Sequence, residues 1–328
     1  MVQILLVGSG SVGTVYAMLL SKGRANITCV CRSNYTVAVS NGFIVHSTIF
    51  GEQQFRPTVA KSVEDAVENK SSGLPFDFIL VCTKAIGDQG GQSIPDLICP
   101  AVTKSHTSIV IIQNGLGVEK IYRKSFPDNT IISGVTYLPT SRVQATIFSH
   151  SETQKLHLGP YPAESATAVD RENTGVFANL IRAGGGEATV HMDVQIERWK
   201  KLIGNATWNP ICALSRSRDL QFLQATPDLA QEFVIRSMRE VVAVAEAVGY
   251  GSYVDENAIK KQVQRSNDRG WPGVEPSMLA DIVAGRPLEV EAIIGEVVRV
   301  AKKEEVDVPR LETLYLLLNS FSNVTIRS

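Results

Sequence analysis

The stretch ILLVGSGSVGTVYAMLL, residues 4–20, decides the fold. Its first apolar run predicts a buried strand, and the apolar residues after the third glycine predict a helix. The glycines have the spacing G-x-G-x-x-G, which in this setting allows a tight turn, close approach of the backbone to pyrophosphate and close helix–strand packing. We therefore expect a dinucleotide site at the helix N-terminus, the alternative being a glycine-rich turn that binds nothing. The loop residues expected to bind the cofactor are Gly8, Ser9, Gly10, Ser11, Val12 and Gly13.

The segment after the second expected strand indicates which dinucleotide binds. An NAD site carries an acidic residue there for the ribose 2′-hydroxyl, whereas an arginine accommodates the 2′-phosphate of NADP. Here the run 27–31 is followed by Arg32 and Ser33, and the first acidic residue of the chain is Glu52. A guanidinium holds phosphate through charge-assisted, fork-like hydrogen bonds. We expect NADP(H), bound through Arg32, and the alternative is an exposed arginine that ends a strand.

Strands and helices alternate along the first part of the chain, and helices alone follow. Strands separated by helices predict a parallel sheet. The expected fold is therefore α/β, with an N-terminal Rossmann-type doubly wound parallel sheet at 1–192 and an all-helical C-terminal domain at 193–328. The β-rich runs occupy residues 4–8, 27–31, 76–82, 108–112 and 130–138.

Four further segments carry local predictions. Residues 145–150 and 155–159 are expected to pair as a β-hairpin. Residues 231–251 have apolar residues at helical spacing and a glycine stop. Residues 287–304 are expected to form a helix, because they begin on a proline and end in lysines.

Composition limits the classes of protein to which the chain can belong. The 328 residues are 44% hydrophobic and 20% charged, which suits a soluble globular protein of two domains. The net charge of −1 and the absence of a basic run argue against nucleic-acid and membrane partners. No apolar run approaches the roughly 20 residues that a membrane span needs. The five cysteines lack a paired framework, so we expect reduced thiols and a cytoplasmic location.

A second stretch, ERWKKLIGNATWNP at 197–210, combines a packed helix with a polar stripe. Lys201, Asn205 and Asn209 recur at i, i+4 and i+8, so they line one side of the helix. Hydride reduction of a carbonyl leaves charge on oxygen, and a positioned ammonium can neutralise it by donating a proton. Lys201 is therefore a candidate proton donor, with the two amides holding a polar substrate. Lys200 competes for this role from a stripe without polar neighbours, and a solvated surface lysine is the alternative for Lys201.

These residues carry a resemblance to a known family. WKKLIGNATWNPICAL, at 199–214, resembles the Lys-x-x-x-Asn-x-x-x-Asn helix of the ketopantoate reductase family, the 2-dehydropantoate 2-reductases. PSMLADIVAGRPLEVEAIIG at 276–295, VCTKA at 81–85 and QNGLG at 113–117 also look like segments of that family. With the glycine loop, the resemblance covers nearly the whole chain. It implies a Rossmann domain followed by a helical domain, with the active site in the cleft between them.

The resemblance implies two catalytic residues. Lys201 would donate the proton to the ketone oxygen, and Glu289 would be a second catalytic carboxylate near Lys201 and the cofactor's nicotinamide ribose. The alternative for Glu289 is a residue of the first helical turn after Pro287 that complements the helix dipole.

The resemblance also implies residues that bind the ligands. Asn114 would lie between cofactor and substrate, and Lys84 near the cofactor ribose, although both could be ordinary loop residues. Ser277 could instead cap a helix that begins at Met278. The residues implied to hydrogen-bond the substrate are Asn205, Asn209, Ser277 and Asn114.

The expected function is NADPH-dependent reduction of 2-dehydropantoate to pantoate, with no metal and with a possible homodimer. One alternative is a reductase of another 2-oxo acid that yields a D-2-hydroxy acid. Another is a non-catalytic NADP-binding regulatory module, which would have no need of a proton donor. The segment with Arg216, Arg218 and Asp219 departs from the family pattern, and the sequence leaves its role open.

Overall fold

The computed structural model describes residues 1–70, 73–86 and 91–327 and divides into two compact units. The expected boundary after residue 192 lies close to the division after Val194, but two short segments of the first half group with the helical unit. Unit 1 consists of Met1–Lys84, Gly90–Gln113 and Glu119–Val194, and unit 2 of Ala85–Gln89, Asn114–Val118 and Gln195–Ser328.

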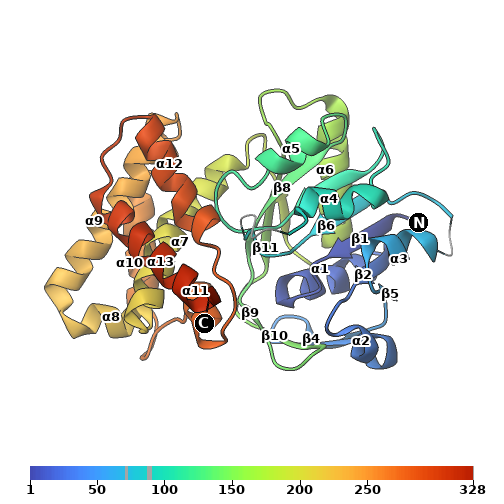
Figure 1. Ribbon diagram of the computed structural model, residues 1–328, viewed down its shortest axis with the longest axis horizontal. Helices are drawn as coiled ribbons and strands as arrows, with labels where there is room; N and C mark the ends of the chain where they lie inside the picture. The colour runs from blue at the N-terminus through green and yellow to red at the C-terminus, as the bar shows by residue number, and fades with distance from the viewer. Residues whose placement is uncertain (71–72, 87–90, 328) are drawn as a thin grey trace. The chain divides into compact units, whose positions relative to one another are not determined.

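Unit 1 is built on an eight-stranded sheet in the order β12-β11-β8-β7-β6-β1-β2-β5 (Figure 1). Neighbouring strands are parallel except for the antiparallel pair β11 and β8. The order runs outward from β1 in one direction as far as β5 and resumes on the other side of β1 at β6, which confirms the doubly wound sheet. The strands are β1 Gln3–Val7, β2 Asn26–Val30, β5 Thr58–Ala60, β6 Phe78–Val81, β7 Ser108–Ile111, β8 Ile131–Tyr137, β11 Lys155–Pro160 and β12 Ala188–Val190.

The central strands of unit 1 are buried on both faces because helices cover the sheet. Every residue of β1, β6 and β7 is buried, as expected for parallel strands between two helical layers. Helices α1 and α6 contact each other, and α6 begins with a capping box between Thr167 and Asp170. The helices are α1 Ser11–Lys22, α2 Tyr35–Asn41, α3 Val63–Glu68, α4 Ile94–Ile98, the 3₁₀ helix η1 Cys99–Ala101, α5 Lys120–Ser125 and α6 Ala168–Ala183.

The expected hairpin between 145–150 and 155–159 is wrong. Strand β10 (Ile147–His150) belongs to a separate four-stranded sheet, where it pairs with β3 (Phe43–Ser47) and β9 (Thr140–Arg142). β4 (Gly51–Phe55) completes that sheet beside β3. The two strands separate because each has its own apolar partners: Phe148 of β10 stacks on Phe43, whereas β11 enters the main sheet beside β8.

Unit 2 is helical, and within the described residues it contains no strand, which confirms the second half of the expected fold. Its core surrounds α7, which contacts α9, α10, α11 and α13. The helices are α7 Gln195–Ser215, α8 Asp219–Ala225, α9 Pro227–Ala247, α10 Glu256–Asn267, α11 Ser277–Val283, the π-helix η2 Glu291–Gly295, α12 Glu296–Lys303 and α13 Pro309–Arg327.

Two helix boundaries differ from expectation. α9 begins at Pro227 rather than at residue 231, because Pro227 suits a first helical turn. No helix begins at Pro287. The backbone carbonyl of Glu289 accepts the first bond, from the N–H of Ile293, and the π-helical turn η2 follows. Glu289 therefore precedes the helix instead of lying within its first turn.

The described part of the chain contains no helix long and apolar enough to cross a membrane.

Candidate functional site

The three glycines of the first loop meet the spatial demands of a dinucleotide site. Gly8 has φ +105°, and a Cβ there would lie 2.5 Å from backbone atoms of Cys82 and Thr83, in the segment after β6. A Cβ at Gly13 would lie 2.2 Å from the carbonyl oxygen of Gly8, so the helix packs directly on the turn. At Gly10 a Cβ would meet nothing within 4 Å. Gly8 and Gly13 are therefore required by packing, whereas Gly10 borders open space where a pyrophosphate can approach the backbone.

The N-terminus of α1 is suited to an anion. No acidic residue lies in its first turn and no side chain caps it, so its first N–H groups point outward with the positive end of the helix dipole. The loop lies at the reversal of strand order between β1 and β6, where ligands bind in open α/β sheets. The hydroxyl of Ser9 has a different role, since it donates to the Val30 carbonyl at 2.9 Å and fixes the loop to β2.

Arg32 is exposed and lies two residues after the end of β2. Within the part of the chain that the structure describes, its guanidinium forms no hydrogen bond or ion pair. Lys84, the other cation expected near the cofactor, is the last residue of the first segment of unit 1 and is partly buried. A free guanidinium at the place where NAD sites carry a carboxylate is suited to a phosphate.

Lys201 and Asn114, which lie 87 positions apart in the sequence, meet in unit 2. The Nζ atom of Lys201 donates to Oδ1 of Asn114 at 2.8 Å, and both side chains are partly buried. Lys200 points in another direction, because successive side chains on a helix are about 100° apart. Its Nζ atom pairs with Oε1 of Glu197 at 2.8 Å. Of the two lysines, Lys201 is therefore the one that contacts Asn114.

Glu289 is 6% exposed, and its carboxylate hydrogen-bonds the segment that begins at Ala85. Its Oε1 accepts a hydrogen bond from the backbone N–H of Ala85 at 2.9 Å. Ala85 was not among the residues expected at the site, and a backbone donor leaves no signal in the sequence. The carboxylate of Glu289 also acts on Lys201, whose ammonium it stabilises.

The pKa of Lys201 is lowered from its usual value to about 8. Burial is the largest cause, because desolvation disfavours the ammonium, and the like charges of Arg198 and Arg265 act in the same direction. Glu289 opposes them by favouring the charged form. An acid whose pKa lies near the working pH is suited to give up a proton during a reaction.

The loop that carries Asn114 is fixed by its neighbours. Gly115 has φ +97°, and a Cβ there would lie 2.2 Å from the carbonyl oxygen of Ala292 in η2. The same carbonyl accepts from the N–H of Leu116 at 2.8 Å. Arg198, 3% exposed, donates through Nη1 to the Gly115 carbonyl at 2.8 Å. Arg198 was missed by the sequence, although its place one helical turn before Lys201 could have drawn attention to it.

Asn209 has a structural partner that the stripe did not predict. Its Oδ1 accepts from the hydroxyl of Ser277 at 3.2 Å and from the N–H of Met278 at 3.0 Å, so it caps α11 from another helix. The alternative in which Ser277 caps a helix starting at Met278 is wrong, because Ser277 is itself the first residue of α11 and makes no capping bond. Asn205 is partly buried and forms no side-chain hydrogen bond within the described residues.

The two amides of the stripe should therefore respond differently to truncation. Asn205→Ala should raise KM by about tenfold, the equivalent of one lost hydrogen bond to a ligand. Asn209→Ala should instead lower the free energy of unfolding by about 1–3 kcal/mol, because it leaves the buried N–H of Met278 unpaired. Steady-state kinetics and urea unfolding measure the two effects, with NADPH binding as the control. A stable Asn209→Ala protein with a raised KM would show that Asn209 serves the ligand instead.

The segment whose role the sequence left open is structural. Asp219, 4% exposed, accepts through Oδ1 from the N–H groups of Leu220 at 2.8 Å and Val274 at 2.6 Å. Arg218 donates to the Gly273 carbonyl at 3.2 Å. Arg216 lies over the ring of Phe321. Arg218 and Asp219 thus fix the loop that leads into α11.

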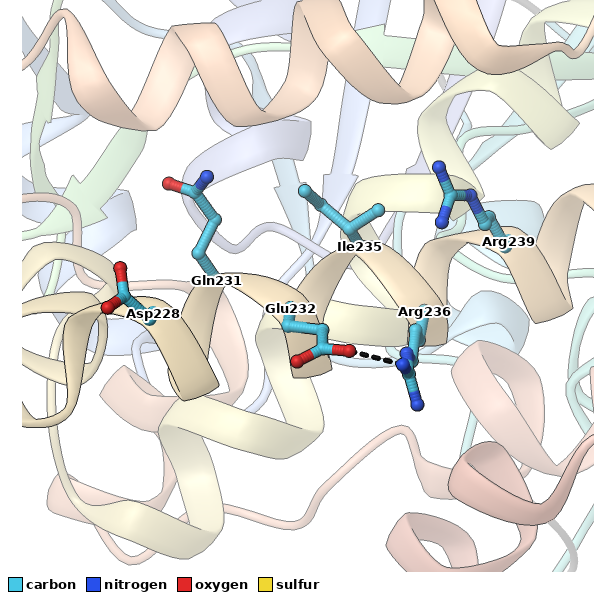
Figure 2. A pocket seen from close by; sticks show the side chains of 6 residues that line it. All are labelled: Asp228, Gln231, Glu232, Ile235, Arg236 and Arg239. Atoms are coloured by element: carbon cyan, nitrogen blue, oxygen red, sulfur yellow. Dashed lines mark ion pairs between the residues drawn. The ribbon is translucent and has the colours of Figure 1, made fainter.

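The two hollows described on the protein surface lie apart from these residues. Figure 2 shows six side chains that rise from successive turns of α9 and line a hollow of about 330 Å³, with Glu232 paired to Arg236. The other, of about 550 Å³, lies in unit 1 beside the amino ends of β7 and β8. Neither contains an expected site residue, and within the described residues no cluster of side chains is suited to hold a metal ion. The residues of the hollow on α9 are Asp228, Gln231, Glu232, Ile235, Arg236 and Arg239.

Comparison with known proteins gives matches over both halves of the chain. The family described as "Ketopantoate reductase PanE/ApbA" matches residues 4–163, and its C-terminal counterpart matches residues 193–322. An uncharacterized protein of Saccharomyces cerevisiae is 29% identical, with 97% of this chain and 93% of that protein covered. The crystal structure of 2-dehydropantoate 2-reductase from Methylococcus capsulatus is 30% identical, covers 100% of this chain and 99% of its own, and has a TM-score of 0.85. The structure of D-mandelate dehydrogenase with NADH and anilino(oxo)acetate has a TM-score of 0.81 over 98% of this chain and 99% of its own, but at 17% identity it shares the fold alone.

Proposed function

Because the chain belongs to the ketopantoate reductase family and is an oxidoreductase, we propose that it reduces 2-dehydropantoate to pantoate with NADPH. Membership supports reduction of a 2-oxo acid with a nicotinamide dinucleotide. The particular substrate, the preference for NADPH and the role of Lys201 are the parts proposed. The observation that carries the proposal is the partly buried ammonium of Lys201, which is bonded to Asn114 and stabilised by Glu289.

The reduction needs a hydride and a proton at the two ends of the carbonyl. Bound nicotinamide supplies the hydride to the carbon. Lys201 gives the proton to the oxygen, and the product is a hydroxyl beside a neutral amine. Desolvation makes this proton easier to release, and Glu289 keeps Lys201 protonated until the transfer. Such help is worth about 10²–10⁴-fold in rate.

The residues proposed to hold the two phosphate groups of the cofactor lie in unit 1, whereas Asn114 and Glu289, proposed to lie beside its nicotinamide end, belong to unit 2. The backbone of the glycine loop and the N-terminus of α1 fit a pyrophosphate, because Gly10 borders open space and no acidic residue opposes the anion. Arg32 would hold the 2′-phosphate. Lys84 and Gln113 follow the carboxyl ends of β6 and β7, and each is the last residue of unit 1 before a segment of unit 2.

Cofactor preference is the first test. Arg32→Ala should weaken NADPH binding by about 10- to 100-fold, because charge-assisted hydrogen bonds to the 2′-phosphate are lost. NADH binding, which involves no such phosphate, should stay as it was. Fluorescence titration with both nucleotides measures this, and Arg171→Ala, which removes another exposed arginine of unit 1, is the control. Equal losses for both cofactors, or a wild type that prefers NADH, would contradict the assignment.

The substrate is tested by NADPH oxidation across a panel of 2-oxo acids that includes 2-dehydropantoate and larger branched and aromatic acids. We expect the highest kcat/KM with 2-dehydropantoate. A higher value with another acid would make the chain a reductase that yields a different 2-hydroxy acid. Tight NADPH binding without turnover of any acid would favour the regulatory module. A cytoplasmic location and a homodimer remain predictions.

A further inference from the structure

Arg198 is a buried cation beside the candidate proton donor, with a contact of its own. It is 3% exposed and lies one helical turn before Lys201 on α7. Burying a guanidinium costs free energy unless the group is hydrogen-bonded, so the contacts of Arg198 must explain why it is buried. One of its hydrogen bonds runs from Nη1 to the backbone carbonyl of Gly115, at 2.8 Å.

That carbonyl belongs to the residue after Asn114, so Arg198 and Lys201 hold the same short loop from the same helix. Lys201 donates to the side chain of Asn114 at 2.8 Å, and Arg198 fixes the next peptide group. On its other side the loop bonds to η2 through Leu116 and Ala292 at 2.8 Å. The loop therefore has few ways to shift while Arg198 is in place.

We propose that Arg198 is a positioning residue, which acts through the Gly115 carbonyl to keep the amide oxygen of Asn114 at hydrogen-bond distance from the ammonium of Lys201. The inference rests on the proposed role of Lys201 as proton donor. Arg198 itself has no contact with the reacting atoms in this scheme. Arg198 affects the reaction by fixing the position of Asn114 relative to Lys201.

Charge is a second effect that must be separated from position. The charged groups that act on Lys201 are Arg198 from α7 itself, Arg265 from α10, and Glu289 from the segment before η2. Arg198 and Arg265 both lower the pKa of Lys201. Of these two arginines only Arg198 also holds the loop, because the side chain of Arg265 forms no hydrogen bond within the described residues.

Three substitutions separate the two effects. Arg198→Lys keeps the charge but is too short and lacks the planar fork, so the bond to Gly115 is lost. Arg198→Met keeps most of the packing volume and loses both charge and bond. Arg265→Met removes a charge near Lys201 and leaves the loop bond intact. Thermal unfolding and NADPH binding establish that each variant is folded.

We expect Arg198→Lys and Arg198→Met to lower kcat by about 10- to 100-fold, since small misplacements of a positioning group have effects of this size. The alkaline limb of the kcat/KM–pH profile should move to higher pH in Arg265→Met, where only a like charge is removed. It should move to lower pH in Arg198→Lys, where the charge stays but the ammonium of Lys201 loses its hydrogen bond to Asn114. A double-mutant cycle with Asn114→Ala should show that Arg198→Lys adds almost no further loss once Asn114 is truncated. Full kcat in Arg198→Lys, or additive losses in the cycle, would overturn the proposal.

A direct titration of Lys201 keeps the inference testable if no 2-oxo acid is turned over. NMR of isotopically labelled lysine follows the Lys201 ammonium against pH, and Lys201→Arg assigns its signal. If Arg198 fixes Asn114 beside Lys201, Arg198→Lys should change the chemical shift of this ammonium and lower its titration midpoint, because a hydrogen bond that favours the charged form is lost. An unchanged chemical shift would overturn the positioning role, whereas absence of turnover with a changed shift would count against the proposed function alone.

Discussion

Replacing Lys201 by alanine is expected to lower kcat by about 10²–10⁴-fold while NADPH still binds. The reason is that the variant lacks the ammonium that donates to Asn114, and water is a poor substitute for a positioned acid. The bond between Lys201 and Asn114, at 2.8 Å, contributes to position rather than to the core, so the protein should fold. Single-turnover oxidation of NADPH with saturating 2-oxo acid is the measurement, because it reports the chemical step directly.

Lys200→Ala is the matched control. Lys200 is adjacent in sequence and carries the same charge, but it pairs with Glu197 and not with Asn114. Its removal should change the single-turnover rate by less than about twofold, since its ion pair joins two residues of the same helix and does not involve Asn114. A severe defect in Lys200→Ala, or a near-normal rate in Lys201→Ala, would show that the proton comes from elsewhere.

The pH dependence of the wild type follows from the same residue. Lys201 donates only when charged, and its pKa is lowered to about 8. The kcat/KM profile reports the free enzyme, so it should be flat below that pH and fall above it. If activity fell only near the usual pKa of lysine, either another group would be titrating or Lys201 would be more accessible to water than its burial indicates.

Much of unit 1 could be predicted from sequence because its signals are local. Apart from the first residues of β1 and β7, the buried runs of β1, β6 and β7 are wholly apolar. The spacing of the glycines predicts the turn that follows β1. The small sheet was missed because β3 and β4 carry polar, partly exposed residues and lack a clear alternation. β10 joins β3 across about a hundred residues, and no local pattern encodes that pairing.

The candidate site was predictable where helix geometry alone determines proximity. The stripe of Lys201, Asn205 and Asn209 needs only the helical repeat. Its environment depends on distant segments: Glu289 meets Ala85 across 204 positions, and Asn209 meets Ser277 across 68. Spacing therefore predicts which side chains share one side of the helix, but it cannot tell a side chain available to a ligand from one already engaged in capping a helix.

Substituting Gly115 by alanine is expected to lower kcat by about 10²-fold, although no chemical group is removed. The residue has φ +97°, where a side chain is strained, and its Cβ would lie 2.2 Å from the Ala292 carbonyl oxygen. Ordinary contact begins near 3.4 Å, so the loop or η2 must move by about 1 Å. Asn114 is the neighbouring residue and must move with the loop, which breaks its alignment with Lys201.

Gly249 separates this effect from simple backbone strain. It has φ +91°, nearly the same as Gly115, but a Cβ there would meet nothing within 4 Å. Gly249→Ala should cost about 1–2 kcal/mol in stability and leave kcat unchanged. Gly115→Ala should lose both stability and kcat, as measured by denaturant unfolding and steady-state turnover. If the two variants lost only stability, and by similar amounts, the close fit of the loop on η2 would have no part in the reaction, and the link from Arg198 through Gly115 to Lys201 would lose its physical basis.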